Sequence, residues 1–193
     1  MLEVGILVGL TAFFFSPFSV RDYWHPEFIF PSFPIEDFMY GFLYGGFLSE
    51  AVDLFLSHRI RRHKSRLIYL IFSVVCFTLL FYIMVKILLL NSIWFLLLFG
   101  FVIGMSSLMF NRKIFKYQVL SGIIGLVLAI IIFQILLFIN PNFIIESWKI
   151  ENLTGILWLG IPLEEHLFAF IFGFGICHFY EVIAGKDIVP KKK

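Results

Sequence analysis

The sequence predicts an all-α integral membrane bundle of about six transmembrane helices with an internal parallel repeat. Composition is the first observation: of 193 residues, 61% are hydrophobic, only 15% are charged, and the mean hydropathy is +0.97. Soluble domains carry about 25% charged residues. The second observation is that several apolar runs approach the roughly 20 residues needed to cross a bilayer. We therefore expect a multi-pass protein of the cell membrane.

Six apolar segments are predicted to form the helices of this bundle. Their expected ranges, in chain order, are about 2–15, 34–56, 67–89, 93–110, 117–139 and 162–184. Pro17 is expected to end the first helix, since proline lacks the N–H that continues a helix. Loops rich in aromatic residues precede Pro34 and Pro162, and aromatic side chains favour the membrane interface.

The third observation is an internal repeat. A shift of 128 positions places Pro34-Ile35-Glu36-Asp37 on Pro162-Leu163-Glu164-Glu165. Both copies put a proline and two acidic residues at the start of a predicted helix, where they suit the first turn and the helix dipole. Trp24 and Trp148 stand before the two copies, with a slightly longer second loop. We divide the chain into a first repeat with a linking helix, residues 1–90, and a second repeat, residues 91–193, within one structural unit.

Positive charges predict the orientation in the membrane. Twelve of the 15 lysines and arginines fall in the links after the second and fourth predicted helices and in the C-terminal tail. The positive-inside rule then puts both termini in the cytoplasm and both acidic motifs towards the outer side. Because the two copies point the same way, they are expected to be related by an axis along the membrane normal, as in parallel repeats. The two acidic pairs are then expected to face one another across the bundle.

The two motifs resemble those of a known family. Pro34-Ile35-Glu36-Asp37-Phe38, followed later by Pro162-Leu163-Glu164-Glu165-His166-Leu167-Phe168, is similar to the membrane-integral lycopene cyclase domain. That domain occurs as paired small subunits or one fused chain in bacteria and archaea, and within a fused carotenoid enzyme in fungi. His166 stands where the family usually has phenylalanine, and one predicted helix, not two, precedes Pro34.

The resemblance implies a lycopene β-cyclase type of activity. Such an enzyme cyclises the ends of an acyclic carotenoid by acid catalysis, with no net redox change, as an isomerase of carotenoid biosynthesis. Two neighbouring carboxylates suit this chemistry, because like charges sharing one proton favour an acid beside an anion. The candidate catalytic residues are Glu36, Asp37, Glu164 and Glu165. The candidate substrate-binding residues are Phe38, Tyr40, His166, Phe168 and Phe170.

No cofactor or metal is expected. The sequence has no glycine-rich dinucleotide fingerprint after a strand, and its cysteines lack metal-ligand spacing. The net charge of +2 gives no reason to expect nucleic acid. The expected partners are a hydrophobic polyene or isoprenoid substrate and the lipid bilayer, with a homo-oligomer or other carotenoid enzymes as further candidates.

Alternatives remain open on the sequence alone. Capping alone explains one acidic motif, although its repetition favours function, because acids in or near a membrane are functional by default. A non-catalytic isoprenoid or lipid binder would keep the same fold. A small proton-coupled transporter could use the same acids, although inverted repeats and broken helices are more typical of transporters. Further down the helices stand Glu50 and Asp53, matched by His178 and Glu181. They either pair with the basic link, or form a lower rim of the site or a proton path.

Overall fold

The structure, a computed structural model, is a bundle of helices. It describes residues 2–25, 34–55, 58–62, 67–109, 112–176, 182 and 186–190. The long helices are α1 (Leu2–Asp22), α2 (Ile35–Phe55), α3 (Leu67–Phe81), α4 (Ser92–Ser107), α5 (Phe115–Ile139) and α7 (Leu163–Ile171). Short elements are helix α6 (Phe143–Ser147), the 3₁₀ turns Arg112–Ile114 and Ile150–Asn152, and the strands β1 (His58–Arg62), β2 (Leu157–Trp158), β3 (Ile161–Pro162) and β4 (Lys186–Pro190). The π-helical segments Tyr82–Ile87 and Phe172–Ile176 extend α3 and α7.

The predicted helical class is confirmed for the described residues. Two helical stretches among them are long and apolar enough to cross a membrane, Val4–Asp22 and Arg112–Ile139. Shorter apolar helices occupy Ile71–Ile87 and Ser92–Ser107. These lengths and compositions support the membrane expectation, while the number of six spans stays a prediction. The last predicted helix is helical to Ile176, and most of its remainder lies outside the described residues.

The expected end of the first helix near Phe15 is wrong, because α1 continues through Pro17 to Asp22. A proline removes only one backbone donor, and membrane helices tolerate this loss when neighbouring packing holds the helix. That packing is aromatic here. The ring of Phe15 lies 5.6 Å from that of Phe95 on α4, and the ring of Phe18 lies 4.8 Å from that of Phe81 on α3.

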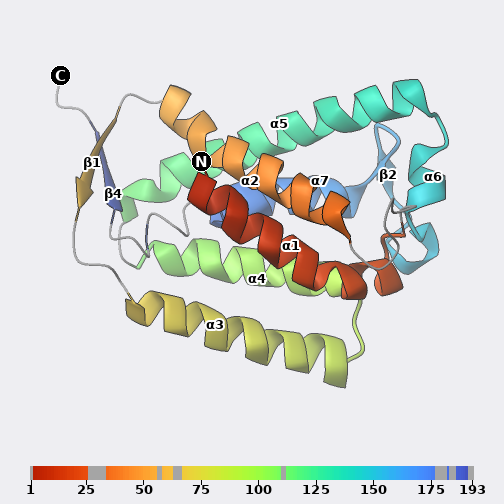
Figure 1. Cartoon of the computed structure of the whole chain (residues 1–193), viewed down its shortest axis with the longest axis horizontal. Helices are drawn as coiled ribbons and strands as arrows, with labels where there is room; N and C mark the ends of the chain where they lie inside the picture. The colour runs from red at the N-terminus through yellow and green to blue at the C-terminus, as the bar shows by residue number, and fades with distance from the viewer. Residues whose placement is uncertain are drawn as a thin grey trace.

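Consecutive long helices alternate in direction along the bundle (Figure 1). The ladder of β1 and β4 therefore lies at one end, and α6 and β2 lie at the other. Helix α1 packs along α2, and α7 with its π-helical extension packs against both α4 and α5. The starts of α2 and α7, which carry the acidic motifs, consequently lie at the end of the bundle opposite to β1 and β4.

Glycines permit the closest helix contacts. A methyl group on Gly41 of α2 would lie 2.9 Å from the Cβ of Ala12 on α1, and one on Gly45 would lie 2.8 Å from Val8. Likewise, a methyl group on Gly125 of α5 would lie 2.8 Å from the carbonyl oxygen of Ala169 on α7. Small residues let helix backbones approach closely. Close packing is important in a membrane because lipid tails are as apolar as the side chains, so no hydrophobic effect drives the helices together.

Two short antiparallel ladders add to the helices. Strand β1 pairs with β4, from His58 opposite Pro190 to Arg62 opposite Lys186, where a basic turn and a tail were expected. The pairing was not foreseen because two five-residue segments far apart in sequence carry no periodic signal of their own. Strands β2 and β3 form a hairpin just before α7. Its two turn residues, Leu159 and Gly160, have φ values of 55° and 77°, as a tight hairpin turn requires.

Candidate active site

A cavity of about 790 Å³ lies among α1, α2, α3, α4, α5 and α7. Most of its wall is aliphatic or aromatic. The lining residues with polar side-chain atoms are Thr11, Ser19, Tyr23, Trp24, Glu36, Asp37, Tyr40, Tyr44, Ser73, Trp148 and Glu165. Three of the four candidate catalytic acids thus share one largely apolar space, to which the two acidic motifs both contribute.

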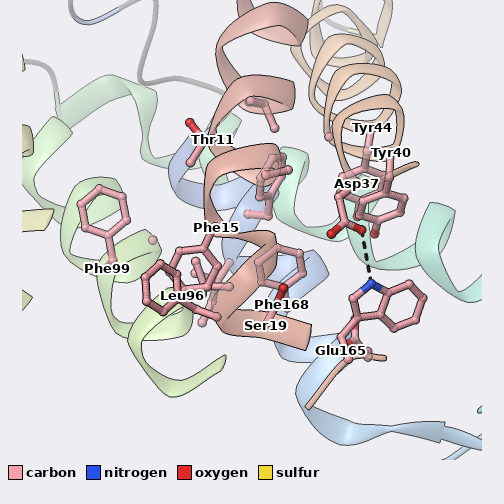
Figure 2. A pocket seen from close by; sticks show the side chains of 18 of the residues that line it. Thr11, Phe15, Ser19, Asp37, Tyr40, Tyr44, Leu96, Phe99, Glu165 and Phe168 are labelled. Carbon is pink, nitrogen blue, oxygen red and sulfur yellow. Dashed lines mark hydrogen bonds between the residues drawn. The ribbon is translucent and has the colours of Figure 1, made fainter. Parts of the chain in front are cut away.

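The first motif places Asp37 in the first turn of α2. The indole N–H of Trp24, which follows α1, donates a hydrogen bond to Asp37 Oδ1 at 3.2 Å (Figure 2). Glu36, the preceding residue, also lines the cavity. Residues 34–37 therefore present both acids of the first motif to the same space.

The second motif places Glu165 in the first turn of α7, with only 8% of its surface exposed. The indole N–H of Trp148 donates a hydrogen bond to Glu165 Oε1 at 2.9 Å. Trp148 is itself buried, and its ring lies 5.6 Å from those of Phe133 and Phe143. The Glu165 carboxyl group is consequently held by a donor that aromatic packing keeps in place.

The two tryptophans lie against each other. Their ring centroids are 4.3 Å apart in an edge-to-face arrangement, and their backbones form an isolated antiparallel bridge. The backbone N–H of Lys149 also donates to the Tyr23 carbonyl at 2.9 Å. These contacts join the segment after α1 to the segment after α6. The paired indoles of Trp24 and Trp148 therefore position both Asp37 and Glu165. The sequence aligned Trp24 with Trp148 without giving either a role.

Glu164 lies apart from the other three acids. It is only 1% exposed and does not line the cavity. Its Oε1 accepts a hydrogen bond from the backbone N–H of Thr154 at 2.6 Å, and its Oε2 is buried with no hydrogen-bonding partner among the described residues. Adjacent helical residues point about 100° apart, so Glu164 and Glu165 face different neighbours. Glu164 faces the loop before the β2–β3 hairpin.

The five candidate substrate-binding residues also divide. Tyr40 and Phe168 line the cavity. Phe38 packs over Gly9 of α1, and Phe170 packs over Gly122 of α5. His166 is buried beside the hairpin, where its Nδ1 lies 3.1 Å from the Pro162 carbonyl oxygen and its ring lies 4.7 Å from that of Trp158. The structure therefore brings two of the five to the acids and turns three towards neighbouring elements.

Tyr23 is a site residue that sequence reasoning missed. It is buried, lines the cavity and directly precedes Trp24, the loop tryptophan that the sequence did single out. Burial raises the pKa of the Tyr23 hydroxyl well above its ordinary value, and the nearby Glu165 and Asp37 add to the shift. Tyr23 therefore stays protonated and supplies a neutral hydroxyl group close to both acids.

The alternatives for Glu50, Asp53, His178 and Glu181 concern positions that the structure does not describe in full. The side chains of Glu50 and Asp53, and the whole of His178 and Glu181, lie outside the described residues.

Comparison with known proteins gives one match. Residues 91–183 match the family model described as lycopene cyclase. This span includes α4, α5, Trp148 and the second acidic motif at the start of α7. No curated protein and no solved structure matches the chain.

Proposed function

Because residues 91–183 match the lycopene cyclase family model, we propose that the chain belongs to this family and cyclises the ends of an acyclic carotenoid by acid catalysis. One structural observation supports this activity independently of the family match. Three carboxyl groups from two distant motifs, Glu36, Asp37 and Glu165, line one apolar and aromatic cavity. Such a space suits a hydrocarbon substrate, and the acids supply the reactive groups that a hydrocarbon lacks.

The proposed reaction moves one proton in and one proton out. A carboxylic acid protonates the terminal double bond, whose π electrons form the new C–H bond and leave a tertiary cation. A nearby double bond of the same chain attacks that cation and closes the ring. A neighbouring carbon then loses a proton to a carboxylate, which restores a double bond. Nothing is oxidised or reduced, so the reaction needs an acid, a base and an environment that excludes water from the cation.

We assign the acid to Glu165 and the base to Asp37. Burial favours the neutral form of a carboxyl group, and Glu165 is the more deeply buried of the two. An indole N–H can only donate, so the oxygen that it contacts acts as an acceptor. A proton on Glu165 therefore belongs on Oε2, because Trp148 occupies Oε1. The Asp37 anion, held in the same way by Trp24, stabilises the cation as it develops.

Aromatic rings supply the rest of the proposed cation site. Tyr40, Phe168 and Trp148 line the same cavity as the two acids. The negative face of an aromatic ring attracts a cation, and the effect strengthens to about 2 kcal/mol where water is excluded. Glu164 has a separate proposed role. By accepting from the Thr154 backbone it fixes the loop that precedes the hairpin and the start of α7.

A parallel repeat and six membrane spans form part of the proposal. Two pairs of equivalent contacts support the repeat. Trp24 donates to Asp37 as Trp148 donates to Glu165. Phe42 packs over Gly5 of α1 as Phe170 packs over Gly122 of α5. The alternating helix directions support six spans (Figure 1). The positive-inside rule puts the acids near the outer surface and both termini in the cytoplasm.

Expression in a bacterium that accumulates lycopene tests the proposed activity. We expect cyclised carotenoid in cells that make the protein, and unchanged lycopene in cells that make Glu165→Gln. Unchanged lycopene with the wild-type protein folded in the membrane would contradict the proposal. If that protein also retained lycopene through purification, the result would favour the non-catalytic binder.

A further inference from the structure

The cavity that holds the carboxyl groups continues to a groove between α1 and α3. Both helices pack against α4, so α4 forms the floor of this groove. Leu96, Phe99 and Gly100 contribute that floor, and all three line the same cavity as the acids. In Figure 2 Phe99 lies on one side of the cavity, and Asp37 and Glu165 lie on the opposite side. One continuous space thus joins the groove to the proposed catalytic site.

The groove walls are open and apolar. Leu10 and Phe14 of α1 line the cavity, yet 44% and 71% of their surfaces are exposed. Val74 of α3 also lines it and is 57% exposed. In a membrane protein, exposed aliphatic and aromatic side chains on long helices face the acyl chains of lipid. The cavity therefore opens towards hydrocarbon at this flank.

The few polar groups of the groove are already satisfied. The Thr11 hydroxyl donates to the Leu7 carbonyl at 2.8 Å, and the Ser73 hydroxyl donates to the Tyr69 carbonyl at 2.7 Å. Each bond lies within one helix, so neither proton is left for a ligand. A polar occupant would lose its hydrogen bonds to water and gain few in return. The chemistry of the groove therefore selects a hydrocarbon.

Hydrogen bonds join the described segments at the opposite end of the cavity. Asp22, at the end of α1, accepts from the backbone N–H of Ser92 at the start of α4, at 2.9 Å. The Asn152 side chain donates to the Asp22 carbonyl at 2.6 Å, and Lys149 Nζ donates to the Arg21 carbonyl at 2.8 Å. Together with the two tryptophans, these bonds join both aromatic loops to the helix ends. Among the described residues, the exposed lining of α1 and α3 marks the side from which a hydrocarbon can enter.

We propose that the groove between α1 and α3 admits a linear polyene sideways from the bilayer and holds its unreacted chain while one end reaches Asp37 and Glu165. The inference rests on the proposed function and names the path and the second binding region for that substrate. It has a consequence for a substrate with two reactive ends. Only one end reaches the acids in each binding event, so the monocyclic product must leave before the second ring is made.

Two matched pairs of substitutions test the groove. Val74→Trp fills the groove, whereas Val75→Trp places the same ring on the neighbouring residue, which is 50% exposed and does not line the cavity. Leu10→Trp and Ile6→Trp form the corresponding pair on α1, since Ile6 is 42% exposed and lies outside the cavity. We expect each groove variant to lower cyclised product per folded protein at least about tenfold, and each control to stay within about twofold of wild type.

A short substrate separates a blocked groove from a damaged catalytic site. The probe is a short acyclic isoprenoid that carries the same terminal double bonds and ends before the groove. Val74→Trp should cyclise this probe as well as wild type does. Equal loss with both substrates, or no loss with either, would overturn the groove assignment.

A binding measurement keeps the test independent of turnover. Purified wild-type protein loaded with lycopene should retain it through washing, as measured by visible absorbance, and Val74→Trp should retain at least about fivefold less. If wild type cyclises neither substrate, the proposed function fails, but this comparison still decides the groove. Equal retention by Val74→Trp and Val75→Trp would refute it.

Discussion

Replacing one carboxyl group at a time should separate catalysis from loop fixation. Glu165 and Glu164 are adjacent, both are buried, and both lie in the first turn of α7. Only Glu165 lines the cavity. Glu165→Gln and Glu164→Gln therefore make the same chemical change in the same turn of helix, with one at the proposed acid and the other at the loop. Glutamine keeps the size of the side chain and an oxygen that accepts a hydrogen bond.

The expected magnitudes follow from the contacts of each residue. In Glu165→Gln the amide oxygen still accepts from Trp148, so the cost in stability is small, but no proton remains to transfer. General acid catalysis contributes roughly 10²–10⁴-fold, and we expect turnover to fall by that factor. In Glu164→Gln the amide oxygen can still accept from the Thr154 N–H, but the amide NH₂ group is buried where Glu164 Oε2 has no hydrogen-bonding partner among the described residues. A buried donor left unpaired costs about 1–3 kcal/mol of folding free energy. Turnover should fall less than about tenfold, because the proton donor is untouched.

The assay is cyclised product per folded protein, with the thermal unfolding midpoint in detergent recorded for each variant. Asp37→Asn should match Glu165→Gln in severity, and the double variant should be hardly worse than either single one, since residues that act as one unit are non-additive. Near-normal turnover in Glu165→Gln would refute the assignment of the acid. A loss in Glu164→Gln as large as in Glu165→Gln would show that the cavity-facing position does not decide catalysis.

Three further predictions concern the indole donors, the buried phenol and the orientation. Trp148→Phe keeps the aromatic packing but removes the donor to Glu165. We expect kcat to fall by about tenfold or more with little change in KM, because the donor stabilises the Glu165 carboxylate that forms as the proton is transferred, and a hydrogen bond to a charged group contributes about 1.5–3 kcal/mol. The raised pKa of Tyr23 means that above about pH 10 the unfolded chain releases the phenolic proton more readily than the folded chain does. Stability must then fall as pH rises, and Tyr23→Phe should lose less of its unfolding midpoint than wild type between about pH 8 and about pH 11; an equal loss in both would contradict the burial of this hydroxyl. Reporter fusions after Lys113 and after Glu151 should report the cytoplasm and the outside respectively, and a shared side would rule out the proposed topology.

The sequence by itself determined the class of fold and the places where helices begin. Long apolar runs favour helices in a membrane because a helix pairs nearly all of its backbone polar groups internally. This is a local property, so α2, α3, α4 and α5 occur where they were predicted. The acidic motifs at helix starts are local as well, because a proline and two carboxylates suit the first turn regardless of what surrounds it.

Only the tertiary structure decided which side chains meet. Glu164 and Glu165 are adjacent in the first turn of α7, so the sequence pattern could not tell which of them faces the cavity. The rotation of α7 against α4 and α5 turns Glu165 into the cavity and Glu164 towards Thr154. The same reasoning applies to Tyr40, which lines the cavity, and to Phe38, which fills a contact with Gly9.

Contacts between residues far apart in the sequence could not be predicted from local patterns either. Trp24 and Trp148 are 124 positions apart, and they meet because the chain after α1 pairs with the chain after α6. Pro17 stays inside α1 because rings from α3 and α4 hold the helix beyond it. The local preference against proline in a helix interior is worth about 3 kcal/mol, and the packing of several neighbours outweighs it. The sequence placed the acids at helix starts, and helix packing chose which of them face the cavity.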